Sequence, residues 1–371
     1  MMTWNGPIDS LREALNFALG RFQSKGKVMD TVVTVGLDLA KSVFQVHAVD
    51  ASGNVVVRRA FRRANLLDFF RKAPRCLVAM EACATAHFWA REIQACGHDV
   101  KIIPPIYVKA YVKRSKTDAA DAEAICEAVT RPTMRFVPIK GEAQQAAGIV
   151  LKTRELLVRQ RTQTANALRA HMMEFGIAAA KGMVSLAKIA DEIRDPASQI
   201  IPELARRALL EMVEQIDALS VRIEGLDADI RKSTQADDVA SRLTTIPGVG
   251  PIIAATVRAV VHDAGGFKSG RDLAAWLGLT PRAHSSGGKE RLGSISKRGN
   301  AQLRTLLIVG ATSILKQGKR GLKLPDWIAG LMARKPFKVV AVALANKTAR
   351  IIWALLTKGG IYQRPASVPA A

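Results

Sequence analysis

At 371 residues, the chain is long enough for two or three domains, each with its own hydrophobic core. Its 55 Lys and Arg residues outnumber its 32 Asp and Glu residues, and the formal net charge of +23 points to a polyanionic partner such as nucleic acid. The excess is concentrated, because residues 241–371 hold 21 basic residues against 4 acidic ones. The alternative is a generally basic protein without such a partner.

The sequence also disfavours a membrane protein, a secreted protein and a zinc-binding protein. The most apolar long stretch, residues 337–356, is interrupted by Lys347 and Arg350, so no uncharged run of 18 residues is present. Charges throughout residues 1–28 leave no continuous apolar segment typical of a signal peptide. The four cysteines show no CxxC spacing, which favours reduced core residues over zinc ligands.

The first part of the chain predicts an α/β domain over residues 31–140, preceded by a separate extension over residues 1–30. Three β-branched or alternating segments predict an antiparallel meander over residues 31–40, 42–49 and 54–61. Helices and strands then alternate, with helices expected over 64–73, 87–97 and 118–129 and strands over 76–81 and 98–105. This order of elements is typical of an RNase H-like fold.

Four carboxylates mark the ends of these elements. Asp38 and Glu81 each end an apolar strand, and Asp118 and Asp121 lie three residues apart at the start of a helix. Acidic groups at the ends of buried strands cost free energy unless something compensates them. Hard cations such as Mg²⁺ (or Mn²⁺) prefer such oxygen ligands, and two of them can cut a phosphodiester. Lys41, three residues after the first carboxylate, is a candidate phosphate contact.

Each carboxylate also has a simpler interpretation as a helix cap or a solvent-facing residue. This alternative is strongest for Asp118, because both Thr117 and Asp118 are natural N-cap residues. The order of all four on this strand pattern nevertheless favours a shared metal site.

Residues 141–240 predict a helical, coiled-coil-like linker. Apolar residues recur there at nearly heptad spacing, at Leu209, Met212, Ile216, Leu219, Ile223, Leu226 and Ile230. Breaks are expected at residues 176–182 and 194–198, which together predict an antiparallel helical hairpin. The spacing fits core packing within one chain and pairing between chains equally well.

Residues 241–371 form the basic domain and predict mostly helices. The sequence IPGVGP at 246–251 precedes an apolar helix and resembles the hairpin of a helix-hairpin-helix motif. There Gly248 and Gly250 would let backbone N–H groups approach a DNA phosphate without reading the base sequence. A plain tight turn between packed helices is the alternative.

A Gly- and Ser-rich loop is expected between residues 278 and 304. It contains Ser285 and Ser286, either of which would be a nucleophile if a base or a metal activated its hydroxyl. Small residues and cations suited to gripping phosphate oxygens follow, at Gly287, Lys289, Arg291, Lys297, Arg298 and Arg304. From composition alone, a flexible phosphate-binding loop without catalysis explains the loop as well.

Together these motifs resemble one family over residues 31–365. They are GLDLAK (36–41), MEAC (80–83), KTDAADAEAI (116–125), IPGVGP (246–251) and the long segment 273–304. The chain resembles insertion-sequence transposases that pair a RuvC-like DEDD domain with a C-terminal serine transposase domain. That family includes Piv-type DNA invertases and bridge-RNA-guided recombinases.

The resemblance implies roles for particular residues and partners. Asp38, Glu81, Asp118 and Asp121 would form the metal site, and Ser286 would be the nucleophile that makes a covalent bond to DNA. Dimers would pair into tetramers, with active sites that combine the acidic domain of one subunit with the serine domain of another. A noncoding bridge RNA would bring element ends and target DNA together. The expected location is the bacterial cytoplasm, in association with the nucleoid.

We therefore expect a transposase or site-specific DNA recombinase that excises and inserts its own element. The alternative enzyme is a metal-dependent, structure-specific nuclease resembling a junction resolvase, which would hydrolyse DNA without a protein–DNA adduct. A non-enzymatic, architectural DNA-binding protein would leave the four carboxylates unexplained.

Overall fold

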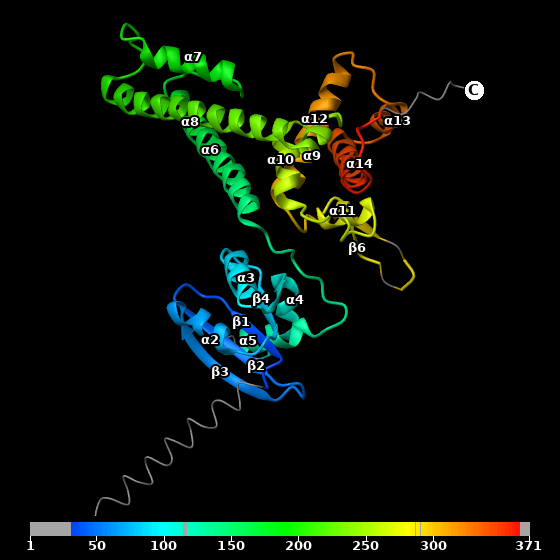
Figure 1. Ribbon diagram of the computed structural model, residues 1–371. Coiled ribbons are helices and arrows are strands. Elements are labelled where there is room, and N and C mark those ends of the chain that lie inside the picture. The colour runs from blue at the N-terminus through cyan, green and yellow to red at the C-terminus, as the bar shows by residue number, and fades with distance from the viewer. Residues whose placement is uncertain (1–30, 114–116, 286, 290, 364–371) are drawn as a thin grey trace, which may run out of the picture. The chain divides into compact units, whose positions relative to one another are not determined.

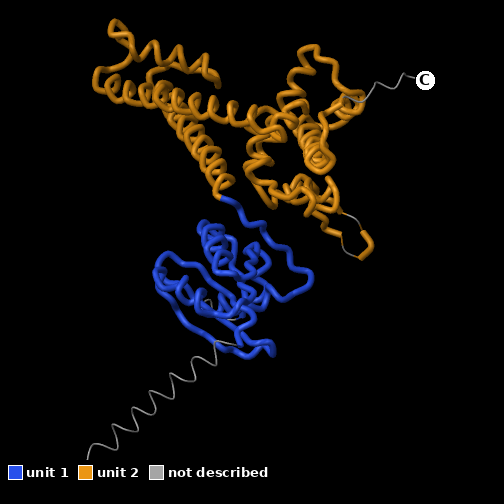
Figure 2. The backbone as a smooth tube through the Cα atoms, viewed as in Figure 1, with its two compact units in different colours: residues 1–141 blue, residues 142–371 orange. Residues whose placement is uncertain are grey.

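A computed structural model of the protein describes residues 31–113, 117–285, 287–289 and 291–363. The chain divides into two compact units, residues 1–141 and residues 142–371, shown in different colours in Figure 2. The predicted extension over residues 1–30 lies outside the described residues. Each unit is considered by itself below.

Unit 1 is built on a five-stranded mixed sheet. Its strands are β1 (Thr34–Asp38), β2 (Val43–Val49), β3 (Val55–Arg62), β4 (Leu77–Glu81) and β5 (Asp99–Ile103). The strand order is β3-β2-β1-β4-β5, with β2 antiparallel to both β1 and β3, and β4 parallel to both β1 and β5. The predicted meander followed by alternating helices and strands is confirmed, and the topology fits an RNase H-like fold.

Helices cover both faces of this sheet (Figure 1). One face packs on α2 (Leu66–Lys72) and α3 (Ala86–Ala95), in a core that includes Phe44, Phe70 and Trp89. The other face packs on α5 (Asp118–Val129), with Ile103 and Ile125 in a second core. Period-two alternation supplies both cores, because successive side chains of a strand point to opposite faces. Short turns of helix complete the unit: η1 (Arg63–Asn65), α4 (Pro105–Val108) and η2 (Lys109–Tyr111).

Three helices open unit 2: α6 (Glu142–Met173), α7 (Met183–Arg194) and α8 (Glu203–Ala236). The gaps between them coincide with the predicted breaks. Along α8 the predicted seam is mostly buried, although Val213 is buried where Met212 was expected and Leu226 is only half-buried. Arg154 of α6 pairs with Asp227 of α8, and α6 and α8 pack along each other, so the seam is used within this chain.

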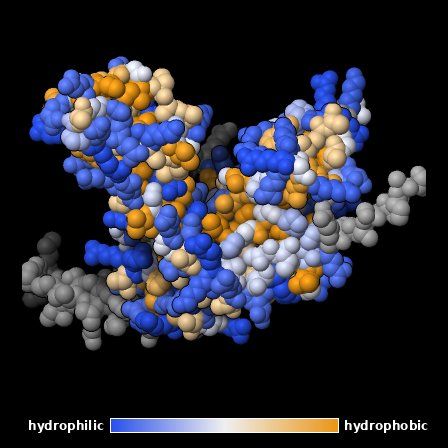
Figure 3. Space-filling model, turned by 90° about the horizontal axis from the view of Figure 1, so that it is seen from above, coloured by the Kyte–Doolittle hydropathy of each residue, from blue (hydrophilic) through white to orange (hydrophobic). Residues whose placement is uncertain are grey.

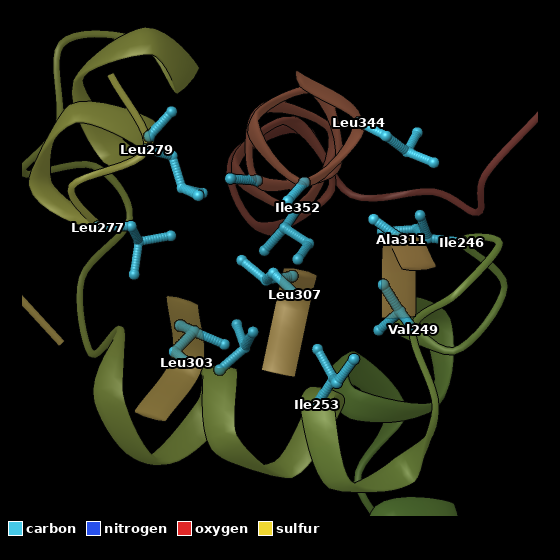
Figure 4. Close-up of a cluster of buried hydrophobic side chains, with 14 of the residues drawn as sticks. Ile246, Val249, Ile253, Leu277, Leu279, Leu303, Leu307, Ala311, Leu344 and Ile352 are labelled. Carbon is cyan, nitrogen blue, oxygen red and sulfur yellow. The ribbon is translucent and has the colours of Figure 1, made fainter. Parts of the chain in front are cut away.

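The remainder of unit 2 is a second helical core. It comprises α9 (Asp238–Leu243), α10 (Pro251–Val260), α11 (Gly270–Trp276), α12 (Ala301–Lys319), α13 (Asp326–Arg334) and α14 (Phe337–Lys358). Figure 4 shows side chains from several of these helices meeting, among them Ile253, Leu307 and Ile352. One expectation is corrected here. The Gly/Ser-rich segment is not only a loop, because β6 (Pro281–Ala283) and β7 (Leu292–Ile295) pair antiparallel as a hairpin.

By length and composition α14 is the one helix in the described part of the chain apolar enough to span a membrane. Seven of its residues, including Leu344 and Ile352, are buried, and it packs against α11 and α12. Its exposed positions include Lys347 and Arg350. These features are those of a core helix. The face of the protein seen in Figure 3 is largely hydrophilic, with apolar groups scattered between polar ones.

Candidate functional site

The first two predicted carboxylates lie at the same edge of the sheet in unit 1. Asp38 is the last residue of β1 and Glu81 the last residue of β4, and the register pairs Leu37 with Met80 just before them. Because β1 and β4 are parallel neighbours, their carboxyl ends meet, with backbones about 5 Å apart. Both side chains are half-buried. The fold therefore brings together two residues that are 43 positions apart in sequence.

The other two carboxylates arrive on α5, which lies directly on β1. At the contact point β1 carries Gly36, where an added Cβ would lie 2.1 Å from the Ala122 carbonyl oxygen and 2.6 Å from the Cys126 amide nitrogen. Only glycine permits this approach. The Thr117 hydroxyl caps the helix by accepting a hydrogen bond from the Ala120 amide at 3.2 Å. Asp118 is therefore not the cap.

Electrostatics show that the four carboxylates share one environment. The pKa of Asp38 is raised from 3.8 to about 6, chiefly because burial removes water from the carboxylate. The negative charges of Asp118, Asp121 and Glu81 raise it further, in that order, while a backbone hydrogen bond from Leu39 opposes the rise. A carboxylate that is repelled by three others is poised to accept a cation or a proton.

The donor chemistry of this cluster suits a hard divalent cation. Four carboxylates offer only oxygen ligands, which Mg²⁺ and Mn²⁺ prefer to nitrogen or sulfur. Within the described residues, however, no group of three or more acidic, His or Cys side chains is arranged closely enough to enclose an ion. Lys41 is exposed, two residues before β2 begins. The carboxylates therefore converge without forming a closed metal site.

The first glycine of the IPGVGP turn in unit 2 is packed closely against α12. Gly248 has φ +80°, and a Cβ on it would lie 2.7 Å from Ile314 and 3.0 Å from the Gly310 carbonyl oxygen. In return, a Cβ on Gly310 would lie 2.1 Å from the Gly248 carbonyl oxygen. Gly250, by contrast, faces open space at the start of α10. The turn therefore packs on α12 through Gly248 and leaves Gly250 accessible.

The β6–β7 hairpin carries the predicted serine segment. Ser286 lies outside the described residues, and Ser285 is exposed, with its hydroxyl accepting a hydrogen bond from the Arg291 amide at 3.4 Å. Gly287 and Gly288 have positive φ angles of 56° and 74°. Five predicted nucleic-acid contacts are exposed along the hairpin and the segment after it: Gly287, Lys289, Arg291, Lys297 and Arg298.

The base of the hairpin is held by close backbone contacts. Arg304 is half-buried and donates to the carbonyl oxygens of Leu277 at 3.0 Å and Arg298 at 2.8 Å. Gly299 has φ +71°, and a Cβ there would lie 1.8 Å from the Trp276 carbonyl oxygen. The Arg304 guanidinium thus fixes the segment after the hairpin to α11, a contact that the sequence did not predict.

An open pocket of about 600 Å³ lies beside this base, with Arg282, His284 and Arg298 in its lining. One N–H group of the Arg282 guanidinium donates to the Ser296 carbonyl oxygen at 3.1 Å. The sequence pattern predicted Arg298 as a phosphate contact but assigned no role to Arg282 or His284. Arg282 and His284 alternate along β6 and the residue after it, and this two-residue spacing is a signal that the sequence carries.

A mixed sheet with carboxylates at the ends of its central strands, joined in one chain to a helical, strongly basic unit, defines a class: RNase H-like DEDD enzymes that act on nucleic acid. The family model for the transposase IS116/IS110/IS902 family matches residues 240–323, and the DEDD_Tnp_IS110 transposase model matches residues 35–177. The chain belongs to this family of insertion-sequence transposases. Membership makes it a DNA-cleaving and DNA-recombining enzyme.

Similar proteins cover almost the whole chain. A putative transposase y4pF/y4sB of Sinorhizobium fredii is 47% identical over 339 residues, 91% of this chain and 87% of the relative. A probable family 20 transposase of Pseudomonas aeruginosa is 47% identical over 332 residues, 89% of this chain and 98% of the relative. The transposase for insertion sequence element IS1328 of Yersinia enterocolitica is 39% identical over 337 residues, 91% of this chain and 100% of the relative.

Proposed function

We propose that this transposase excises and inserts its own insertion sequence by combining the carboxylate cluster of unit 1 with a serine nucleophile in unit 2. The observation that carries the proposal is the meeting of Asp38 and Glu81 at one edge of the sheet, and the raised pKa of Asp38 reflects its burial and three neighbouring negative charges. Such a cluster is costly to fold, and its cost is offset when a divalent cation binds. Asp38, Glu81, Asp118 and Asp121 would hold Mg²⁺ or Mn²⁺, which would stabilise the negative charge that develops on the phosphate during the reaction.

In this mechanism the Ser286 hydroxyl oxygen attacks a phosphorus atom of DNA. The serine proton passes to a base, the bond from phosphorus to the leaving deoxyribose oxygen breaks, and that oxygen takes up a proton. A phosphoserine bond now holds one DNA end. Attack by a hydroxyl of another DNA end reverses the step and releases the serine, so strands are rejoined without an external energy source.

Two partners belong to the same proposal. A noncoding bridge RNA would pair with element ends and target DNA, and RNA helices are bound mainly through their shape and backbone. Dimers that pair into tetramers would bring the carboxylates of one subunit to the serine of another. In unit 2, Gly250 and the exposed hairpin residues Gly287, Lys289, Arg291, Lys297 and Arg298 would contact phosphates. The set of predicted phosphate contacts also includes Lys41 in unit 1, and Gly248 and Arg304 in unit 2, which make internal contacts as well.

The serine step is tested by trapping a denaturation-resistant protein–DNA adduct. We expect Ser286→Ala to abolish both the adduct and recombination, while Ser285→Ala, at the preceding residue in the sequence, retains both. Asp121→Ala should abolish recombination and leave DNA binding nearly unchanged. Full strand exchange by Ser286→Ala would rule out the serine mechanism. DNA hydrolysis without any adduct would favour the structure-specific nuclease.

A further inference from the structure

The face of the sheet that carries Asp38 continues past α5 onto β3. Side chains alternate along a strand, and Asp38 shares its face with Gly36, which contacts α5. The register pairs Asp38 with Gln45 on β2, and Gln45 with Ala60 on β3. These three residues therefore form one row across the sheet, from the carboxylate to the edge strand.

Two arginines flank this row on β3. Arg58 pairs with His47 and Arg62 pairs with Val43, so both lie on the Asp38 face, one row to either side of Ala60. The charge of Arg58 reaches His47, whose pKa is lowered mainly by burial; the negative charge of Glu123 opposes this lowering, and the Arg58 guanidinium adds to it. Both arginines are exposed, and no ion pair or hydrogen bond engages either guanidinium within the described part of the unit.

This part of the face is uncovered among the described residues. The helix α5 packs on β1, β2 and β4, whereas β3 is the edge strand of the sheet. Ala60 and Val43 are exposed, with Val43 at 47%. A small residue therefore lies between two long cations, at the end of the row that runs through Gln45 to Asp38. The backbones of β3 and β1 are about 10 Å apart, two strand spacings.

Charge complementarity identifies the occupant. Four carboxylates repel a polyanion, so DNA cannot approach them closely unless nearby cations offset that repulsion. Arg58 and Arg62 supply two fixed positive charges on the same face, because guanidinium groups stay protonated at any relevant pH. Guanidinium groups also bind phosphate oxygens in a bidentate manner.

We propose that the Asp38 face of β3, with Arg58 and Arg62 on either side of Ala60, is the surface on which the DNA strand lies as its phosphate reaches the carboxylates. The occupant is DNA, because DNA is what this family cuts. That the bound DNA leads to the carboxylates rests on the proposed function, but the binding of DNA itself requires neither metal nor serine.

The opposite face of the sheet supplies a matched control. Arg59 alternates with Arg58, lies on the α2 side, and places its guanidinium 5.1 Å from the centre of the Phe61 ring. Phe61 in turn packs on Phe69 of α2, at 4.8 Å between ring centres. Lys72 is exposed at the end of α2. The double substitution Arg59→Gln/Lys72→Gln therefore also removes two positive charges, but from the opposite face.

The test measures binding of the full-length protein to a fluorescein-labelled DNA duplex of an element end, by anisotropy, in EDTA and over a range of salt concentrations. Each lost phosphate contact lowers the slope of log affinity against log salt by about 0.9. We expect Arg58→Gln/Arg62→Gln to lower the slope by about 2 and to weaken binding about tenfold or more in 0.1 M salt. The control pair should change the slope by less than half as much.

Equal slopes for the two pairs would overturn the proposal, since only net charge would then matter. The same measurement with an RNA duplex separates the two nucleic acids. A larger loss for RNA than for DNA would reassign the surface to RNA and refute the DNA assignment. Ala60→Phe should place a bulky side chain between the two arginines and weaken DNA binding without lowering the melting temperature. Because cleavage is not measured, failure here leaves the carboxylate and serine proposals untouched, and their failure leaves this one standing.

Discussion

Replacing Asp38 by Asn should stabilise the protein in the absence of divalent cations. Asn has nearly the same shape and can keep the hydrogen bond from the Leu39 amide, but it carries no charge to be desolvated or repelled. The rise in the Asp38 pKa from 3.8 to about 6 corresponds to about 3 kcal/mol against the ionised form. Because the side chain is only half-buried, solvent screening reduces this to about 1–2 kcal/mol.

The pH dependence follows from the sign of the shift. The folded protein binds the Asp38 proton more tightly than the unfolded chain, so wild-type stability falls as pH rises from about 4 to about 6. Asn does not titrate. The advantage of Asp38→Asn should therefore be absent below pH 4, grow across this window and remain constant above pH 6, where it would raise the melting temperature by roughly 3–6 °C.

The assay is thermal unfolding followed by circular dichroism, with hydrogen exchange of peptides from β1 and β4 to assign the transition to unit 1. Asp68→Asn is the control, because Asp68 is exposed and pairs with Arg71 at 2.8 Å on α2. It should change stability little. A destabilised Asp38→Asn protein, or a gain that does not vary with pH, would refute the inference that repulsion and burial act on this carboxylate.

Magnesium extends the same experiment to the proposed metal site. An ion at ten times its dissociation constant stabilises the folded protein by about 1.4 kcal/mol. Wild type should gain this stability and Asp38→Asn should not, so their melting temperatures should converge as Mg²⁺ is added. Equal effects of Mg²⁺ on both proteins would place any bound ion elsewhere.

Three further substitutions test packing that supports the two units. Gly36→Ala should destabilise unit 1 by about 3 kcal/mol in urea unfolding, because its Cβ would meet the main chain of α5 at 2.1 Å. Arg206→Met should destabilise unit 2 by about 3 kcal/mol or more, because the buried guanidinium donates to five carbonyl oxygens in the last turn of α7 and in the segment that follows it. Arg207→Met, at an exposed position, should be nearly neutral. Gly310→Ala should cost about 2 kcal/mol by colliding with the turn before α10, while Gly330→Ala, in open space on α13, should be neutral or slightly stabilising in the same measurement.

The sequence predicted the architecture of unit 1 because its signals are local. Period-two runs defined the strands, and parallel strand order alone brought Asp38 to Glu81. The approach of α5 was not predictable in the same way. It depends on Gly36, whose lack of a side chain matters only against a helix that begins about 80 residues later. The position of Asp118 at the first helical residue, rather than at the cap, was decided by the Thr117 hydroxyl, which accepts the hydrogen bond from the Ala120 amide.

Unit 2 shows where local signals fail. The strands β6 and β7 are three and four residues long and mostly exposed, so they carry no alternation between buried and exposed residues. Arg206 looks like a surface residue in a heptad pattern, yet it is 7% exposed because loop carbonyls surround it. The role of Gly248 depends on Gly310, and the pairing of two distant glycines leaves no pattern in the sequence.

The cations and carboxylates of unit 1 should respond differently to solution conditions, which separates DNA binding from DNA cutting. A metal that binds the carboxylates must displace the proton from Asp38 below about pH 6. The affinity for the metal should therefore decrease as the pH is lowered. Arg58 and Arg62 do not titrate there, and their hold on phosphate responds to salt instead. A bound metal ion would cancel part of the negative charge that repels DNA, so metal and DNA should each strengthen the binding of the other by the same factor. DNA should therefore stay bound near pH 5 while the metal-dependent step is lost. High salt should instead release the DNA.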